Sequence, residues 1–211
     1  MQLHHSFFKN AFLLTGLILL LGSCGFQQLQ AQDVRAGWVV GGNLSDVEPL
    51  TPGTSFKPGI TLGAFMAFKI NDFLQFQPEM LFDQMGYQSN QEGVFPVSVR
   101  SHYLSFPLLL NFTLPIDLGD NIRDINFQAG LIPASLINVK DKISRIDQTD
   151  LFRKIDLQYA AGITLELSDD VSFAARYSYS SRSIVKNVQG GVNAGPFNEN
   201  VHLSIRWNFL K

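Results

Sequence analysis

The last third of this chain alternates between large apolar residues and polar or small residues over three long segments. Between Ile155 and Leu167 every odd-numbered residue is apolar, and the same period continues from Val171 to Tyr179 and from Val201 to Phe209. A period of two indicates β-strands, because successive side chains of a strand point to opposite faces. The segments exceed the usual strand of about 5 to 6 residues and match the roughly 9 to 11 residues that cross a bilayer at a tilt. We therefore expect a transmembrane β-barrel.

The N-terminal segment has the features of a secretory signal peptide. Lys9 precedes an apolar run from Ala11 to Leu21. This run is too short for a spanning helix of about 20 residues, but it fits the core of a signal peptide. We therefore expect the chain to be exported to the outer membrane of a Gram-negative-type envelope.

Two cleavage sites are open. The segment from Leu21 to Cys24 resembles a lipoprotein box, in which Cys24 would become a lipidated N-terminus. The alternative is cleavage after Ala31, a small residue. Cleavage after Ala31 is favoured, because an embedded barrel gains little from an added lipid. This predicts a signal peptide over residues 1–31 and one barrel domain over residues 32–211.

The composition excludes several other classes of protein. Charged residues make up 16% of the chain, against about 25% in ordinary soluble domains. No later segment approaches the 18 or so consecutive apolar residues of a spanning helix, so a helical membrane protein is excluded. A net charge of −2 without a basic run gives no support to a nucleic-acid partner. A single cysteine excludes an internal disulfide framework.

The alternation predicts an all-β, antiparallel up-and-down barrel of eight strands. Long and short connections should alternate between them, as in membrane barrels with short periplasmic turns and long outer loops. Both termini would then be periplasmic. The expected strands are Val34–Gly42, Gly59–Ile70, Phe73–Gln84, His102–Leu114, Asp124–Leu136, Ile155–Leu167, Val171–Ser180 and Val201–Phe209. The expected long loops are Asn43–Lys57, Ser89–Val97, Lys140–Asp150 and Ser181–Pro196, and the short turns are Asn71–Asp72, Pro115–Arg123 and Ser168–Asp169.

Three features indicate that the apolar face meets lipid, whereas a soluble lipocalin-type barrel would turn it inward. Small residues lie on the polar face, as a narrow interior requires. Aromatic residues lie toward the strand ends of the apolar face, as in interfacial girdles. The polar face also carries both signs of charge, which predicts a paired network that plugs the lumen. The residues of this expected network are Arg35, Lys69, Glu79, Asp83, Asp156, Glu166, Arg176 and Arg206.

Some residues do not fit a regular strand pattern. Pro78, Pro107 and Pro133 fall within expected strands, where each removes a hydrogen-bond donor, and a β-bulge is the expected repair. Phe65, Leu81 and Leu109 fall on the polar face, where we expect them to pack locally inside the lumen.

Several segments resemble the PorT-like outer-membrane β-barrel proteins. The more specific ones are QFQPEMLFDQMG at Gln75–Gly86 and YLSFPLLLN at Tyr103–Asn111, with weaker matches at Gly37–Leu44, Gly59–Phe68 and Gln128–Leu131. The resemblance covers nearly all of the exported chain and implies an outer-membrane barrel. The family's name-giving member takes part in type IX protein secretion, a role that does not transfer residue by residue. Such barrels usually end on an aromatic residue, whereas here Leu210 and Lys211 follow Phe209.

No motif for catalysis, a cofactor or a metal is present in the exported chain. His102 and His202 lie near the outer ends of strands without the spacing of a metal or nucleophile site. Glu79 and Asp83 share a face and are expected to neutralise cations rather than to act as acid and base. The Gly190-Gly191 segment lacks the strand-to-helix context of a phosphate-binding loop.

We therefore expect a non-enzymatic, monomeric barrel with outer-membrane lipid as its surroundings. Its expected role in the envelope is structural or that of an adaptor, with envelope or secretion-machinery proteins as partners. The alternatives are a barrel that binds a ligand or passes small solutes, and a soluble lipocalin-like binding barrel.

Overall fold

The alternating segments form long antiparallel strands in the computed structural model, which describes residues 34–48, 54–89, 97–114, 122–141, 149–186 and 196–210. The expected signal peptide and Cys24 lie outside these residues. The described strands are β1 (Val34–Glu48), β2 (Thr54–Asn71), β3 (Leu74–Ser89), β4 (Val97–Ser105), β5 (Leu108–Leu114), β6 (Asp124–Asp141), β7 (Ile155–Glu166), β8 (Val171–Ser180) and β9 (Phe197–Leu210). A short 3-10 helix, η1, covers Thr149–Leu151. Within the described part of the chain, no helix is long and apolar enough to span a membrane.

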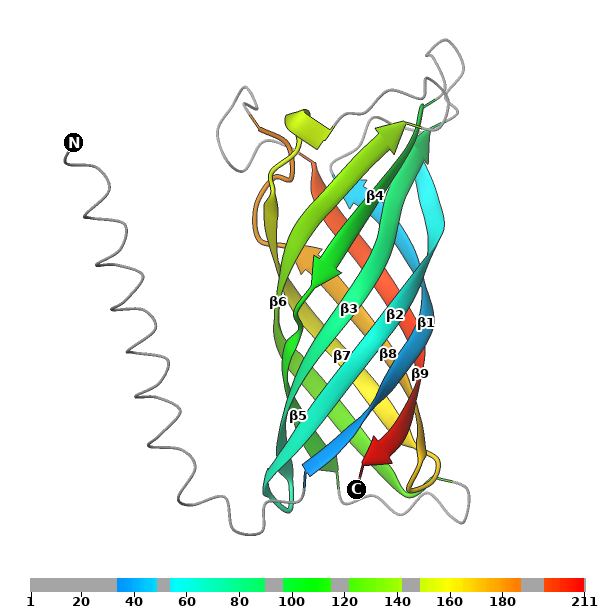
Figure 1. Ribbon diagram of the computed structural model, residues 1–211, viewed down its shortest axis with the longest axis vertical. Coiled ribbons are helices and arrows are strands. Elements are labelled where there is room, and N and C mark those ends of the chain that lie inside the picture. The colour runs from blue at the N-terminus through cyan, green and yellow to red at the C-terminus, as the bar shows by residue number, and fades with distance from the viewer. Residues whose placement is uncertain are drawn as a thin grey trace, which may run out of the picture. The chain divides into compact units, whose positions relative to one another are not determined.

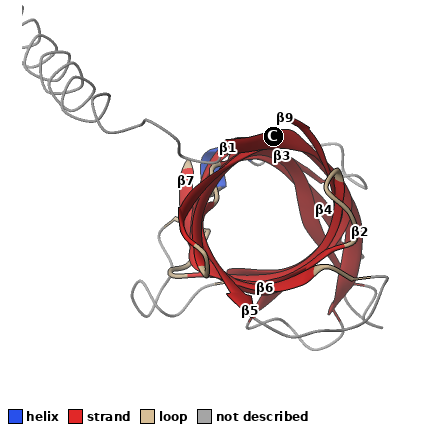
Figure 2. Cartoon of the chain, turned by 90° about the horizontal axis from the view of Figure 1, so that it is seen from below, coloured by secondary structure: helices blue, strands red, loops and turns tan. Residues whose placement is uncertain are grey.

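The strands close into a barrel. Apart from β4 and β5, which do not pair with each other, strands that follow one another in the chain pair, and β1 also pairs with β9, which joins the two ends of the sheet. Figures 1 and 2 show the tilted strands and the closed ring. Both β4 and β5 lie between β3 and β6, so they are two halves of one interrupted strand, and the barrel has eight strand positions. The prediction of an eight-stranded antiparallel up-and-down barrel is therefore confirmed.

The break between β4 and β5 is caused by prolines and not by a bulge. On β3, Leu81 pairs with Ser105 and Pro78 pairs with Leu108, so the same register continues across the break. The ladder lacks donors at Pro107 and Pro133, but Glu79 N donates to Pro107 O over 2.8 Å. The expectation of bulges at the three prolines was wrong. The register shifts lie elsewhere, for example opposite His102 and Tyr103 in the β4–β6 pairing.

The strands continue farther toward one end of the barrel than expected. The first loop was expected over Asn43–Lys57, but Asn43 pairs with Gly59 and Ser45 with Lys57 in the β1–β2 ladder. These polar side chains point inward and are buried, which allows the strands to extend beyond the apolar band. We call this end the loop end. The opposite end, which holds Asn71, residues 167–170 and the start of β1, is the turn end (Figure 1).

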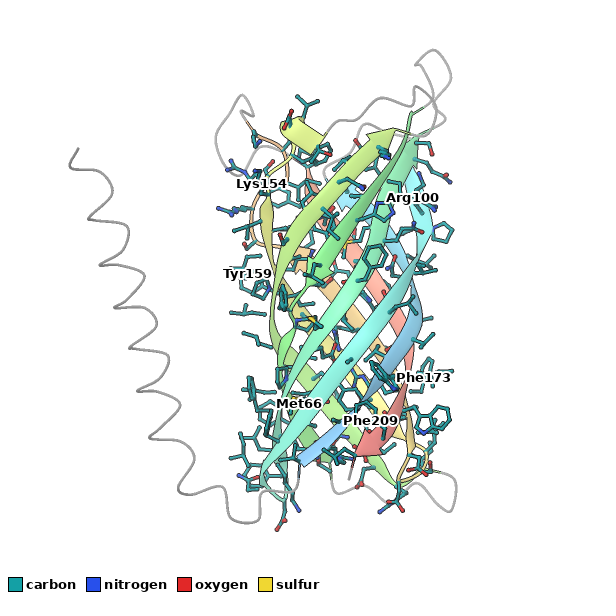
Figure 3. All side chains as sticks on the ribbon, viewed as in Figure 1. Met66, Arg100, Lys154, Tyr159, Phe173 and Phe209 are labelled. Atoms are coloured by element: carbon teal, nitrogen blue, oxygen red, sulfur yellow. The ribbon has the colours of Figure 1, made fainter. Side chains whose placement is uncertain are left out.

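The burial pattern is the reverse of that of a soluble protein. Large apolar side chains face outward, with Trp207 65% and Tyr159 60% exposed, while charged side chains such as Arg206 and Glu79 are buried inside. The rings of Trp38 and Phe209 meet on the outside at a centroid distance of 5.1 Å. Figure 3 shows Phe209 and Phe173 near the turn end and Tyr159 nearer the loop end. Apolar area costs about 25 cal/mol per Å² in water, so this band requires a lipid environment.

Candidate functional site in the barrel lumen

The middle of the lumen contains one carboxylate held by two arginines. Glu79 of β3 accepts hydrogen bonds from Arg176 of β8 and Arg206 of β9, each with a shortest distance of 2.8 Å. The Glu79 side chain is fully buried and those of the arginines are nearly so. The odd or even position of each residue in its strand directs it inward, and barrel closure brings β3 opposite β8 and β9. We call these three residues the central network.

Neutral polar groups add hydrogen bonds to the central network. Gln77 Nε2 donates to Glu79 Oε1 over 2.6 Å, and Arg206 Nη1 donates to the hydroxyl of Thr164 over 3.0 Å. With its amide oxygen turned toward Arg206, Gln128 accepts from Nη1 over 2.8 Å. The Phe65 ring lies 5.8 Å from the Arg206 guanidinium carbon and covers it from the β2 side. These hydrogen bonds satisfy part of the buried ion pair. The Nε atoms of Arg176 and Arg206 are buried without a hydrogen-bond partner among the described residues.

A second ion pair lies in the lumen near the turn end. Arg35 Nη1 is 3.0 Å from Glu166 Oε2, and Gln75 and Asn126 add hydrogen bonds to this pair. The cavity between this pair and the central network has a volume of about 20 Å³, enough for about one water molecule. Lys69 lies apart from both groups, because its half-exposed side chain pairs with Asp72 in the β2–β3 turn over 3.0 Å.

A chain of hydrogen bonds lies on the loop-end side of the central network. Asn200 Nδ2 lies 2.5 Å from Nε2 of His202, and the opposite side of the imidazole ring carries Nδ1. That nitrogen lies 3.2 Å from the Thr61 hydroxyl, which in turn donates to Asp83 Oδ1 over 2.8 Å. His202 is therefore a buried lumen residue and not the rim residue that the sequence suggested. The sequence signal for this lumen position is that His202 falls on the polar face of the last strand.

The two histidines lie on opposite faces of the barrel wall. The His102 ring stacks on Phe82 on the outer face at 5.7 Å, and its Nδ1 lies 2.7 Å from Asn138 Oδ1. The wall separates it from His202, so the two do not share a site. Among the described residues, no group of three His, Cys, Asp or Glu side chains is suitable to hold a metal ion.

Asp156 of β7 lies deeper toward the loop end and is held by neutral donors. Its Oδ2 accepts from Gln158 and Ser180 over 2.8 Å and from Asn198 over 2.9 Å. Asn198 also approaches the buried Tyr103 hydroxyl at 3.3 Å. The expected charge network is thus divided in the structure: Glu79, Arg176 and Arg206 meet, Arg35 and Glu166 meet, and Asp83, Asp156 and Lys69 each have other partners.

A buried apolar cluster lies at the loop end of the lumen. Its side chains from the strands include Met85, Val99 and Val139, and Phe152 and Ile184 join them from the segments beyond β6 and β8. An isolated bridge between Phe152 and Val185 holds these two segments together. We call this cluster the plug. The alternation did not predict it, because its two loop residues lie outside any periodic segment. Phe65 and Leu81 belong to a smaller buried cluster, and Leu109 belongs to a third one. These residues therefore pack locally inside the lumen, as expected.

The family comparison agrees with this architecture. A family model described as "Outer membrane protein beta-barrel domain" matches residues 27–186, which is more than half of the chain. The chain belongs to this family. Membership assigns the barrel to the outer membrane, in agreement with its lipid-facing band. No curated protein matches the chain significantly.

Solved structures with a similar fold include several bacterial outer-membrane barrels. Ail, the attachment invasion locus protein of Yersinia pestis, solved in complex with the heparin analogue sucrose octasulfate, is 14% identical with a TM-score of 0.47, and the match covers 83% of this chain and 99% of Ail. Neisserial surface protein A is 14% identical with a TM-score of 0.46, covering 85% and 100%. OprG from Pseudomonas aeruginosa is 13% identical with a TM-score of 0.45, covering 84% and 95%. At these identities the likeness concerns the fold.

Proposed function

We propose that this outer-membrane barrel is a closed, monomeric and non-enzymatic protein that serves the envelope as an anchored scaffold or adaptor and not as a channel. The observation that carries the proposal is the filling of the lumen at two levels. The central network crosses the middle, and the buried apolar residues of the plug lie at the loop end. A solute would have to separate Glu79 from both arginines and displace the plug, and breaking a buried ion pair costs about 3–5 kcal/mol.

Conductance tests this proposal. The mature protein reconstituted in planar bilayers should give no steady current above that of protein-free bilayers, and liposomes containing it should not swell in arabinose or glycine. A general porin reconstituted in parallel supplies the positive control, and heat-modifiable gel migration verifies that the barrel is folded. Steady single-channel steps from the folded protein would overturn the proposal in favour of the small-solute or ligand-binding alternative.

A link to protein secretion is the finer form of the adaptor role, and it rests on the PorT-like resemblance. The segments that carry the resemblance contain Glu79, Asp83 and Pro107, which lie in the wall and the lumen. These segments therefore support the barrel architecture. A partner protein would have to contact other residues, which are exposed. A secretion partner in the periplasm would meet the turn end, where Asp72 is 98% exposed.

Site-specific crosslinking distinguishes an adaptor from a structural anchor. A photo-crosslinking amino acid at Asp72 should capture envelope or secretion proteins if the barrel is an adaptor, and the same group at Lys186 of the loop end is the matched control. Lipid adducts alone at Asp72 would reject the adaptor role and leave the structural one.

Analytical ultracentrifugation tests the oligomeric state. Sedimentation of the detergent-solubilised protein as a dimer or larger assembly would reject the proposed monomer.

A further inference from the structure

Four cationic side chains converge at the loop end, outside the lumen. Arg153 and Lys154 precede β7, and Arg182 and Lys186 follow β8. Together with Ile155 they line a shallow hollow of about 400 Å³, a volume within the range of small-ligand sites. Among the residues that the structure describes, no carboxylate lines this hollow. We call it the basic hollow.

Backbone hydrogen bonds fix the two segments that form the basic hollow. Arg153 N donates to Ile184 O over 2.7 Å, and Lys186 N donates to Leu151 O over 2.9 Å. The Phe152–Val185 bridge lies between these bonds, with the Phe152 side chain buried in the plug. The cations are thus presented by backbone that is anchored in the barrel, so their convergence is a property of the fold.

Among the described residues, none of the four cations forms a salt bridge with a carboxylate. Lys186 Nζ donates to the backbone oxygen of Asp150 over 2.8 Å, and Arg182 Nη2 donates to that of Ile155 over 3.2 Å. Arg182 also attracts the buried carboxyl of Asp156 through space, without forming an ion pair. Like charges gathered in one hollow repel one another, and an anion bound there relieves this repulsion.

The position of the basic hollow favours a lipid over a soluble anion. Ile155, which lines it, is 58% exposed and is the first residue of the lipid-facing column that continues through Leu157 to Tyr159. Figure 3 shows Lys154 closer to the loop end than Tyr159, so the hollow adjoins the loop-end border of the lipid-facing band, where lipid headgroups lie. Farther around the same rim, Arg100 of β4 is paired with Lys140 of β6 in the ladder. Like charges directly opposite each other are destabilising unless something neutralises them.

We infer that the basic hollow binds the phosphate group of a phosphorylated lipid in the outer leaflet. Arginine guanidinium groups match phosphate oxygens in geometry, and lysines next to a membrane surface attract anionic headgroups. The acyl chains of the same lipid would cover Ile155 and Leu157. Such a site fixes the barrel to its surrounding lipid and does not depend on whether the lumen conducts.

Lipid retention measured by native mass spectrometry tests the inference. The full mature protein is reconstituted in phosphatidylcholine nanodiscs that contain diphosphoryl lipid A or its dephosphorylated form, and is then extracted with mild detergent. The wild type should retain diphosphoryl lipid A at least tenfold more than the dephosphorylated form. The double variant Lys154→Gln/Lys186→Gln should lose most of this difference. Both lysines are exposed, so the changes leave the barrel interior intact.

The matched control is Arg123→Gln, which removes an exposed cation that pairs with Asp169 at the turn end. It should retain lipid A as the wild type does. An equal loss of lipid A retention in this control and in the double variant would mean that the effect comes from net charge, and would overturn the proposed site.

Competition in detergent with a sulfated oligosaccharide decides between a lipid and a soluble polyanion as the source of the bound anion. If the oligosaccharide binds at the same residues as tightly as lipid A, the hollow serves a soluble polyanion and the lipid assignment is wrong.

Discussion

Replacing Glu79 by Gln should strongly destabilise the barrel. Glutamine keeps the shape of the side chain but removes the charge that two buried guanidinium groups share. In the native barrel, Glu79 accepts bonds of 2.8 Å from both Arg176 and Arg206. Hydrogen bonds to charged groups contribute about 1.5–3 kcal/mol each, and breaking a buried ion pair costs about 3–5 kcal/mol. We expect a loss of about 3–5 kcal/mol in the free energy of unfolding, a large fraction of a typical total of about 5–15 kcal/mol.

Guanidinium-induced unfolding in lipid vesicles measures this loss. The fluorescence of Trp38 and Trp207 reports the transition, because both rings face lipid in the folded barrel and water in the unfolded chain. Heat-modifiable migration supplies an independent measure of the folded fraction. Lys69→Gln is the matched control: it also removes one member of an ion pair, but at the exposed turn, and should leave the transition unchanged.

A double-mutant cycle separates the charge effect from a packing defect. Combining Glu79→Gln with Arg206→Gln should cost less than the sum of the two single changes, because fewer unpaired charges remain buried. The reasoning is refuted if Glu79→Gln and Lys69→Gln give the same transition, or if the double change is strictly additive. Either result would mean that Glu79 is not the buried counter-ion of the arginines.

Three further predictions test other parts of the molecule. Leu203→Arg, midway along the lipid-facing side of β9, should destabilise the folded barrel by about 2–4 kcal/mol in the same unfolding assay. Glu199→Arg, near the loop end of that strand, should destabilise it much less. Equal losses of stability in the two variants would contradict the lipid-facing assignment. Phe152→Ala should loosen the plug and speed amide hydrogen exchange in residues 149–154 without altering β1, and uniform protection would refute its role. Intact-mass spectrometry should give a mature chain that begins at Gln32 without lipid, and a lipidated peptide that begins at Cys24 would overturn that cleavage site.

The sequence determines which residues face inward, and tertiary structure determines which of them meet. The period of two assigns Glu79, Arg176 and Arg206 to one face of their strands, because side-chain direction along a strand is a local property. It also placed His202 on that face, although the expected strand boundary suggested the rim. Strand boundaries were less predictable, since Asn43 and Lys57 are polar and resemble loop residues until their lumen partners are known. The prolines did not produce the bulges that the sequence suggested, because pairing with the neighbouring strand maintains the register across the break between β4 and β5.

Pairing and clustering depend on closure of the barrel. Glu79 and Arg206 lie far apart in the chain, and they touch because the shear and closure of the sheet bring β3 opposite β9 across a narrow lumen. The plug and the basic hollow combine residues near 153 with residues near 184, which a backbone bridge aligns. No periodic signal encodes these meetings. Local alternation therefore sets the class of fold and the orientation of its faces. The partners of each side chain are set only in the closed barrel, because contacts across the lumen depend on strand register and not on local pattern.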